Sequence, residues 1–193
     1  MREPQMLDAA LRVFADRGYT GATMDDIAGA AGVTKPLVYS YFASKEDLFE
    51  RCVEHAGDSL MEAMESAGAD EEDPERMMWE RALAYFRFVG DHSAEWRLMI
   101  TEPIPGEGLA RTRIRVVEQM QRFLEEGIGG KASELEPLAH ALVGVGEALA
   151  NWWMDHPHET AEAMAVREMN FVWAGLRALD AGERWLPPEF TSP

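Results

Sequence analysis

Cysteine and strand-forming residues are scarce in this 193-residue chain. Its single cysteine, Cys52, excludes an intrachain disulfide framework and any metal site built on several cysteines. Valine, isoleucine and threonine together number 23, whereas alanine, leucine, methionine and glutamate number 79. Because the first group favours strands and the second favours helices, we expect an all-α protein.

Long apolar runs and enzyme motifs are missing as well. No run approaches the roughly 20 residues of a membrane span, and no signal-peptide core follows Met1, so we expect a cytoplasmic protein with no membrane partner. No nucleophile motif, phosphate loop or carboxylate pair stands out by its spacing, so neither an enzyme nor a cofactor is expected. His156 and His158 flank a proline without a third ligand in register, so no metal is expected either.

Negative charge is abundant and unevenly spread. The net charge is −17, and only three lysines are present, of which Lys35 and Lys45 lie in one short N-terminal stretch. Residues 1–51 carry 6 basic and 8 acidic side chains, whereas residues 52–193 carry 12 and 27. A strongly acidic chain is repelled by nucleic acid, but this acidity belongs to the C-terminal three quarters.

Helical periodicity and capping residues predict nine helices and no strand. Gly18 is expected to end the first helix, and Thr23, Thr34 and Ser44 are expected to begin the next three. The remaining helices are expected from Asp73–Pro74 to about residue 90, from Ser93, and over residues 109–128, 134–156 and 159–181.

Residues 23–42 have the pattern of a helix-turn-helix. Ala28 is small where the second helix approaches, Gly32 supplies the turn, and Val38 and Phe42 fill the wedge between the helices. Acids outnumber bases about two to one in the chain, yet the outward-facing side chains from residue 34 to residue 45 include none. Their hydroxyl, phenol and ammonium groups are the ones that bond phosphate oxygens, so this face predicts contacts with DNA.

The stretch from Met6 to Leu48, with its ending YxYFxSKEDL, resembles the DNA-binding domain of the TetR/AcrR family of bacterial transcriptional regulators. The resemblance implies a helix-turn-helix domain at residues 1–46 and an effector-binding and dimerisation domain at residues 47–193. It implies a homodimer formed by the last two helices, about residues 134–181, on near-palindromic double-stranded operator DNA. It also implies a small-molecule effector whose binding weakens operator binding, so we expect a repressor.

The resemblance also implies roles for single residues. Two threonines bond phosphates from helix N-termini, three residues face the major groove, where a leucine contacts a thymine methyl, and tyrosines and a lysine contact the backbone. Two departures are a proline where the family commonly has a small residue and the lack of a basic arm, since only Arg2 precedes the first helix. The expected DNA-binding residues are Thr23, Thr34, Lys35, Pro36, Leu37, Tyr39, Ser40, Tyr41 and Lys45.

The effector is not identified by any motif, so its site is predicted from single residues. Glu147 is the only charged residue between Glu136 and Asp155, with Asn151 one turn further on. It either pairs across the dimer seam, which we favour because this helix is expected to dimerise, or lines the pocket, where an uncompensated carboxylate would select a cationic ligand. Six tryptophans and twelve methionines suit an apolar or aromatic effector. The expected ligand-binding residues are Phe86, Trp96, Met99, Met120, Phe123, Glu147 and Asn151.

A rival interpretation is a helical small-molecule-binding or interaction protein whose helix-turn-helix no longer binds DNA. The net charge of −17 supports it. The local outward face of residues 34–45 supports a DNA-binding regulator, and we give it more weight because charges beyond about 8–10 Å are screened by salt.

Overall fold

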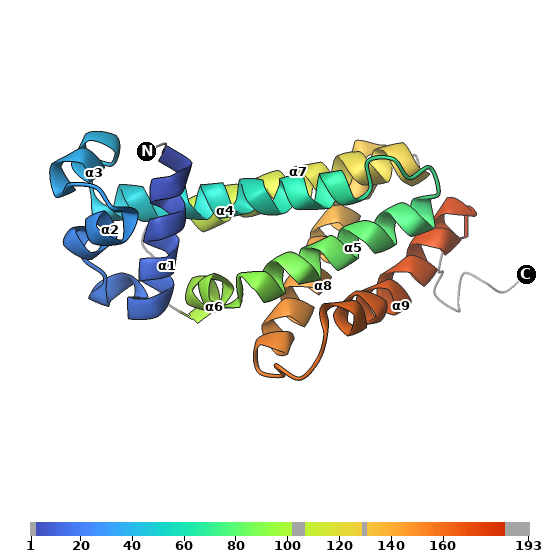
Figure 1. The fold of residues 1–193 in the computed structure, drawn as a ribbon. Helices are drawn as coiled ribbons and strands as arrows, with labels where there is room; N and C mark the ends of the chain where they lie inside the picture. The colour runs from blue at the N-terminus through green and yellow to red at the C-terminus, as the bar shows by residue number, and fades with distance from the viewer. Residues whose placement is uncertain (1–2, 102–106, 129–130, 184–193) are drawn as a thin grey trace, which may run out of the picture.

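The computed structural model describes residues 3–101, 107–128 and 131–183, and Figure 1 shows helices joined by short connections in this part of the chain. The predicted breaks at residues 103–106, 129–130 and 187–188 lie outside the described residues. Within them the structure has nine helices and no strand, which confirms the predicted all-α class. The helices are α1 (Glu3–Gly21), α2 (Met24–Ala31), α3 (Lys35–Tyr41), α4 (Lys45–Ala67), α5 (Pro74–Asp91), α6 (Ser93–Thr101), α7 (Gly108–Ile128), α8 (Ala132–Met154) and α9 (Ala161–Asp180).

Most helix starts coincide with the capping residues expected from the sequence. The Thr23, Ser44 and Asp73 side chains each accept a hydrogen bond from a backbone N–H in the first turn of α2, α4 and α5, respectively. Thr34 stands at the N-cap of α3 but makes no such bond. Gly32 has a φ of 67° at the end of α2, a left-handed conformation that favours glycine.

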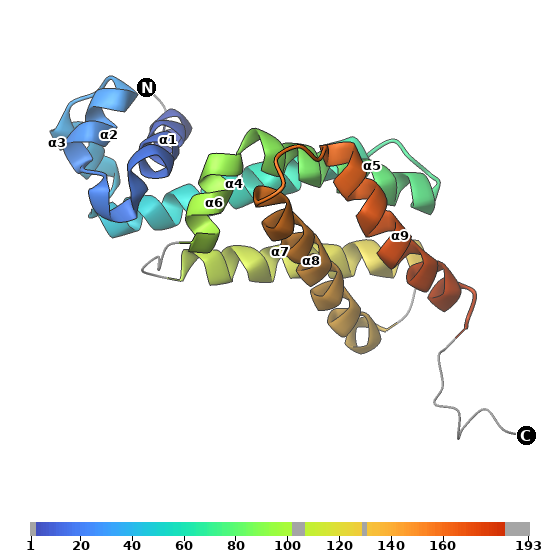
Figure 2. The same cartoon turned by 90° about the horizontal axis from the view of Figure 1, so that it is seen from below.

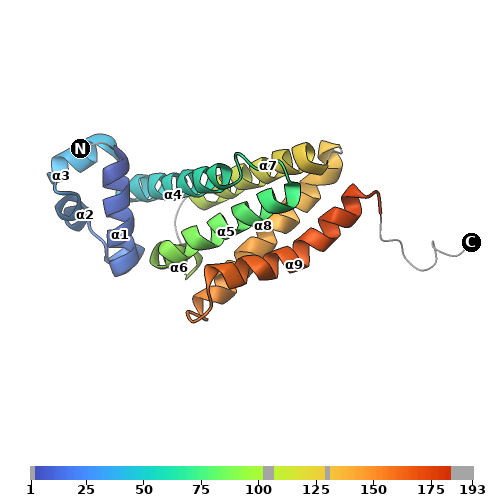
Figure 3. The ribbon, with the colours of Figure 1, turned by 45° about the vertical axis from the view of Figure 1, so that its right-hand side comes forward.

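The first three helices form a group at one end of the molecule (Figures 1 and 3). Gly18 interrupts α1 with a φ of 71°, so the helix is broken at the predicted stop although a helical turn follows it. Phe14, Ile27 and Val38 are fully buried between these helices, together with Phe49 from α4. Because α4 runs without a break from Lys45, the proposed boundary after residue 46 falls inside a continuous helix.

The remaining helices form an elongated second unit. Helices α4 and α7 run parallel, and α8 crosses α7 obliquely, as Figure 2 shows. Two apolar clusters fill this unit, one around Leu124 between α7, α8 and α9, and one around Phe86 between α5, α8 and α9. None of the described helices is long and apolar enough to cross a membrane.

Candidate DNA-binding face and ligand cavity

The turn between α2 and α3 is held by backbone hydrogen bonds. The Val33 N–H donates to the Ala28 carbonyl over 2.9 Å, and the Gly32 N–H donates to the Gly29 carbonyl over 3.1 Å. Val38 and Phe42 are fully buried beneath this turn. The inner side of α3 is therefore fixed against the core, and its opposite side is left to solvent.

The outer side of α3 carries three large side chains that a solvated helix rarely exposes. Leu37, Tyr39 and Tyr41 are 40%, 47% and 45% exposed. The four other predicted contact residues of this segment, Thr34, Lys35, Pro36 and Ser40, are exposed beside them. The structure thus gathers seven of the nine predicted residues on one surface, which we call the α3 face.

Local partners already occupy several polar groups of this region. The Lys35 ammonium lies 2.7 Å from a carboxylate oxygen of Asp25, and the Ser40 hydroxyl donates to the Leu37 carbonyl over 2.6 Å. Asp25 lies next to the face, so the ammonium does not act as an isolated charge. The exposed donors of the α3 face that remain are the two hydroxyphenyl groups, the Thr34 hydroxyl and the other two N–H groups of Lys35.

The two remaining predicted phosphate ligands have structural partners. The Lys45 ammonium donates to the carbonyls of Tyr19, over 2.9 Å, and Ala22, over 3.1 Å. The Thr23 hydroxyl donates to Asp26 over 2.6 Å and accepts from its backbone N–H. Lysine has three N–H donors, so Lys45 keeps one for a phosphate, whereas the single hydroxyl proton of Thr23 is used.

A cavity of about 200 Å³ lies between α4, α5, α7 and α8, with α6 and α9 contributing to its wall. The cavity wall on α4 runs from Val53 to Glu65, which corresponds to about 18 Å of helix. Most of the wall is apolar, with five methionines among its side chains. The predicted ligand-binding residues on this wall are Trp96, Met99, Met120, Phe123 and Glu147.

The two other predicted ligand-binding residues, Phe86 and Asn151, do not line the cavity. Phe86 is completely buried in the core, where its ring packs edge-on against Trp153. Asn151 is exposed and accepts a hydrogen bond from the Trp96 indole N–H over 3.0 Å. The one-turn spacing from Glu147 therefore does not bring Asn151 to the cavity, and its side chain bonds Trp96 of the wall instead.

Glu147 is compensated within its own chain. Its carboxylate accepts from the Arg113 side chain over 2.9 and 3.2 Å, so α8 and α7 are joined at the cavity wall. The pair across the dimer seam stays a prediction, although this carboxylate already has a cation within its own protomer. Because of that cation, Glu147 no longer gives a reason to expect a cationic ligand.

Sequence analysis missed a polar cluster on the cavity wall, formed by Tyr85 of α5 and Glu168 of α9. Burial raises the pKa of the Glu168 carboxyl to about 7 and the pKa of the Tyr85 phenol well above its ordinary value. A signal was present, since Glu168 lies four residues after Met164 and four before Val172, on the buried stripe of α9. A carboxylate in a buried stripe indicates either a cationic or hydrogen-bonding partner or a role in ligand binding.

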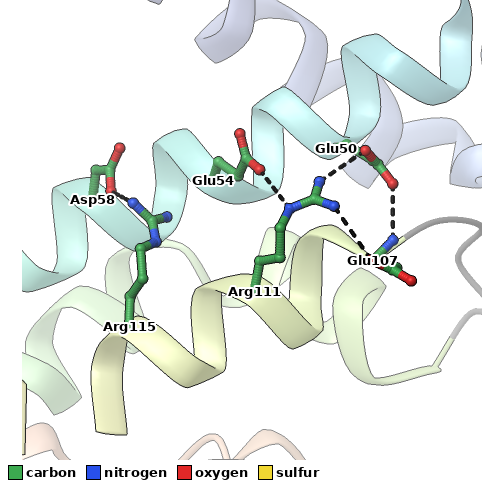
Figure 4. Close-up of polar contacts among 6 residues, drawn as sticks. All are labelled: Glu50, Glu54, Asp58, Glu107, Arg111 and Arg115. Carbon is green, nitrogen blue, oxygen red and sulfur yellow. Dashed lines mark hydrogen bonds and ion pairs between the residues drawn. The ribbon is translucent and has the colours of Figure 1, made fainter. Parts of the chain in front are cut away.

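A ladder of ion pairs joins α4 to α7 along the outside of the cavity (Figure 4). Arg111 contacts Glu50 over 2.9 Å and Glu54 over 3.1 Å, and Arg115 contacts Asp58 over 2.5 Å. The first turns of α4 pack in the core of the N-terminal group. The ladder therefore joins α7 of the cavity wall to α4, the helix whose first turns pack against the N-terminal group.

The outer surface of α8 and α9 exposes large apolar side chains. Phe171 is 74% exposed, and Trp152 and Val166 are also exposed. Trp153, Val172 and Leu176 of the same two helices are buried in the core of the protomer itself. Among the described residues, no cluster of His, Cys, Asp or Glu could hold a metal ion.

Comparisons with known proteins agree on one family. The family model described as "Bacterial regulatory proteins, tetR family" matches residues 6–52, and the model "Tetracyclin repressor-like, C-terminal domain" matches residues 74–175. The HTH-type transcriptional activator FasR of Mycolicibacterium smegmatis is 28% identical over 181 residues, which span 91% of this chain and 83% of that protein.

Solved structures show the same arrangement. A TetR-like transcriptional regulator from Rhodococcus sp. RHA1 has 32% sequence identity and a TM-score of 0.69, covering 91% of this chain and 95% of that one. The regulator FadR from Bacillus subtilis, in complex with stearoyl-CoA, has 18% identity and a TM-score of 0.72, covering 95% and 100%. The second likeness concerns the fold alone.

Proposed function

The chain belongs to the TetR family of helix-turn-helix transcriptional regulators, and on that premise we propose that it is a homodimeric repressor released from its operator by a small apolar effector. The observation that carries the DNA-binding part is the α3 face, which exposes one leucine and two tyrosines without an acidic side chain of its own. The cavity beside α4 supports the effector part, since its wall is mostly apolar.

Operator recognition is tested by comparing two variants on the DNA upstream of the chain's own gene. Leu37→Ala removes a contact to a thymine methyl, so it changes the preference among operator variants by about tenfold for the affected base pair. Lys45→Ala weakens binding to all sequences alike and lowers the salt slope by about one phosphate contact. Because Lys45 also bonds two carbonyls, its variant is checked for folding by circular dichroism first.

The rival function, ligand binding without DNA binding, is favoured by the net charge of −17. Fluorescence anisotropy with a labelled near-palindromic fragment separates the two. Saturable binding that survives excess unrelated DNA supports a regulator. Equal and weak binding to the near-palindromic fragment and to unrelated DNA contradicts a DNA-binding regulator. Unchanged operator affinity in both Leu37→Ala and Lys45→Ala contradicts it as well.

Dimerisation is proposed through the outer surface of α8 and α9. Phe171, Trp152 and Val166 are 74%, 43% and 46% exposed there, and a second copy of the chain would remove these large apolar side chains from water. The self-association of two such surfaces gives a four-helix bundle with two-fold symmetry, which matches a near-palindromic operator. A 21.6 kDa species in sedimentation at micromolar concentration contradicts this arrangement.

A further inference from the structure

The polar groups of the cavity are not evenly distributed over its wall. Glu168 from α9 and Tyr85 from α5 converge on Gly146 of α8: a β-carbon there would lie 3.3 Å from a Glu168 carboxylate oxygen and 3.4 Å from the Tyr85 ring. Glycine at this position therefore leaves room for both side chains on the same part of the wall. Side chains of α5 and α9 thus meet beside α8 and form one polar point on a mostly apolar wall.

Neither side chain has a hydrogen-bond partner within the described part of the chain. The Tyr85 hydroxyl is buried and unpaired. No ion pair or hydrogen bond joins Glu168 to another described residue, and the nearby carboxylate Glu147 is already neutralised by Arg113. The Glu168 carboxyl thus lacks a cation where Glu147 has one, and an unpaired buried carboxylate is costly unless a ligand compensates it.

The surroundings of this point suit a positively charged nitrogen. Tyr85 packs edge-on against Trp96, with ring centroids 6.0 Å apart, so a second aromatic ring of the cavity wall lies beside Tyr85. Ammonium groups form charge-assisted hydrogen bonds with carboxylates and are attracted to aromatic faces. The net charge of −17 also raises the local concentration of cations around the whole molecule.

We propose that the effector is a hydrophobic amine, whose protonated nitrogen binds between Glu168 and Tyr85 while its apolar body lies along the methionine-rich wall. The proposal rests on the proposed function, because it assigns a ligand class to the same cavity. In the complex, the ammonium donates to the Glu168 carboxylate and to the Tyr85 hydroxyl oxygen. The Tyr85 hydroxyl then has an acceptor role that the protein alone does not give it.

A second candidate head-group site, Arg81 on the cavity wall one turn before Tyr85 on α5, would favour an acid instead. Its guanidinium lies 4.5 Å from the centre of the Phe123 ring, and its Nε is buried without a partner. Glu65 and Glu126 are close enough to stabilise the charge of this guanidinium. A carboxylate ligand placed there would meet two like charges, so we favour the amine at Glu168.

The test compares three ligands with one chain length: decylamine, decanol and decanoate. Isothermal titration calorimetry on the full-length protein measures their affinities for the wild type and for Glu168→Gln, Tyr85→Phe and the control Glu118→Gln. The control removes one negative charge from the exposed side of α7, outside the cavity. Decylamine is expected to bind the wild type and the control at least about tenfold more tightly than decanol, and decanoate most weakly.

The variants separate the contribution of the ligand's head group to the affinity from the contribution of its apolar body. Glu168→Gln is expected to abolish the preference for decylamine over decanol, and Tyr85→Phe to reduce it, with decanol affinity unchanged in both. Decylamine affinity is also expected to rise from pH 6 to pH 8 as Glu168 ionises, because the facing Tyr85 stays neutral and Glu147 stays paired with Arg113.

Three outcomes are distinguishable. An amine preference that depends on Glu168 supports the proposal. Equal affinities, or a preference for decanoate, overturn it and leave the cavity as an effector site of another class. If none of the three ligands binds, the effector-binding part of the proposed function fails as well, whereas operator binding by the free protein is measured independently.

Discussion

Unpaired polar atoms are concentrated at the cavity. Among the described residues, five buried side-chain nitrogen or oxygen atoms lack a hydrogen-bond partner, and three of them belong to residues on its wall, Arg81, Tyr85 and Thr112. Each such atom costs about 1–3 kcal/mol relative to a paired one. These atoms lower the stability of the folded protein at the place where a ligand would bind, as expected for a functional site.

Glu168→Gln is expected to stabilise the protein in a pH-dependent way. The folded-state pKa of about 7 lies above the ordinary value of 4.5, so the wild type loses stability as the pH rises from about 4.5 to about 7 and stays at the lower level above that range. Glutamine cannot ionise, so the variant avoids a loss on the order of 3 kcal/mol.

Urea unfolding of both proteins between pH 5.5 and pH 8 measures this effect. The gain in unfolding free energy should be larger at pH 8 than at pH 5.5. A variant that is less stable than the wild type at pH 8 would show that the Glu168 carboxylate has a stabilising partner.

Sequence patterns predicted the helices better than the cavity. Capping threonine, serine and aspartate residues specify helix starts through bonds within one turn, so Thr23, Ser44 and Asp73 could be recognised without tertiary information. The partner of Glu147 is Arg113, 34 residues away on another helix, and no local pattern encodes that distance. Glu147 could therefore be named as a candidate from the sequence, but neither its cation nor the second carboxylate on the wall, Glu168, was predicted.

At the scale of helices, the close approach of α4 and α7 depends on Gly57. A β-carbon at this position would lie 2.2 Å from the Thr112 methyl carbon, so Gly57→Ala forces the two helices apart. Overpacking of this kind costs about 1–3 kcal/mol, which exceeds the gain in helix propensity of up to about 1 kcal/mol.

Gly29→Ala is the matched control for this substitution, because a β-carbon in that helical position contacts nothing within 4 Å. Thermal unfolding should show a lower Tm for Gly57→Ala and an equal or higher Tm for Gly29→Ala. Equal changes in both variants would mean that α4 and α7 do not approach closely at Gly57.

The ion-pair ladder between α4 and α7 should transmit the state of the cavity to the N-terminal group (Figure 4). Arg111→Gln removes the contacts with Glu50 and Glu54, which are largely accessible to solvent, so the loss in Tm is small and diminishes at high salt. Ligand affinity should stay unchanged, while the ligand releases DNA less effectively.

The control for the ladder is Arg87→Gln, which breaks the exposed pair with Glu162 between α5 and α9, away from α4. Calorimetry on both variants measures ligand affinity, and titrations of the DNA complex with ligand measure how effectively the bound ligand releases DNA. If Arg111→Gln and Arg87→Gln release DNA like the wild type, the ladder does not couple the two units.

At the scale of the molecule, dimerisation should depend on the exposed residues of α9. Phe171→Asp places a charge in the centre of the proposed interface, so it should shift the dimer towards the monomer by at least about tenfold in dissociation constant. Sedimentation velocity measures the shift, and an exposed control, Leu109→Asp on α7, should leave the dimer intact. A stable Phe171→Asp dimer would place the interface elsewhere.

Negative charge is concentrated in the part of the chain that follows the DNA-binding helices. Residues 52–193 carry 27 acidic side chains against 12 basic ones, whereas residues 1–51, which include the α3 face, carry 8 against 6. The acidic part keeps DNA away from the cavity and the dimer surface, and it attracts cationic ligands. Operator binding should therefore be confined to the N-terminal group of helices and should weaken steeply with salt.

Anisotropy of a labelled near-palindromic fragment from the upstream DNA, titrated first with protein and then with decylamine, tests the central claim most directly. The account predicts saturable binding by the free protein, release by decylamine, and a Glu168→Gln variant that binds the same DNA but is released much less readily. Saturable binding to the cavity with no effect on bound DNA, or no sequence-dependent DNA binding at all, would contradict it.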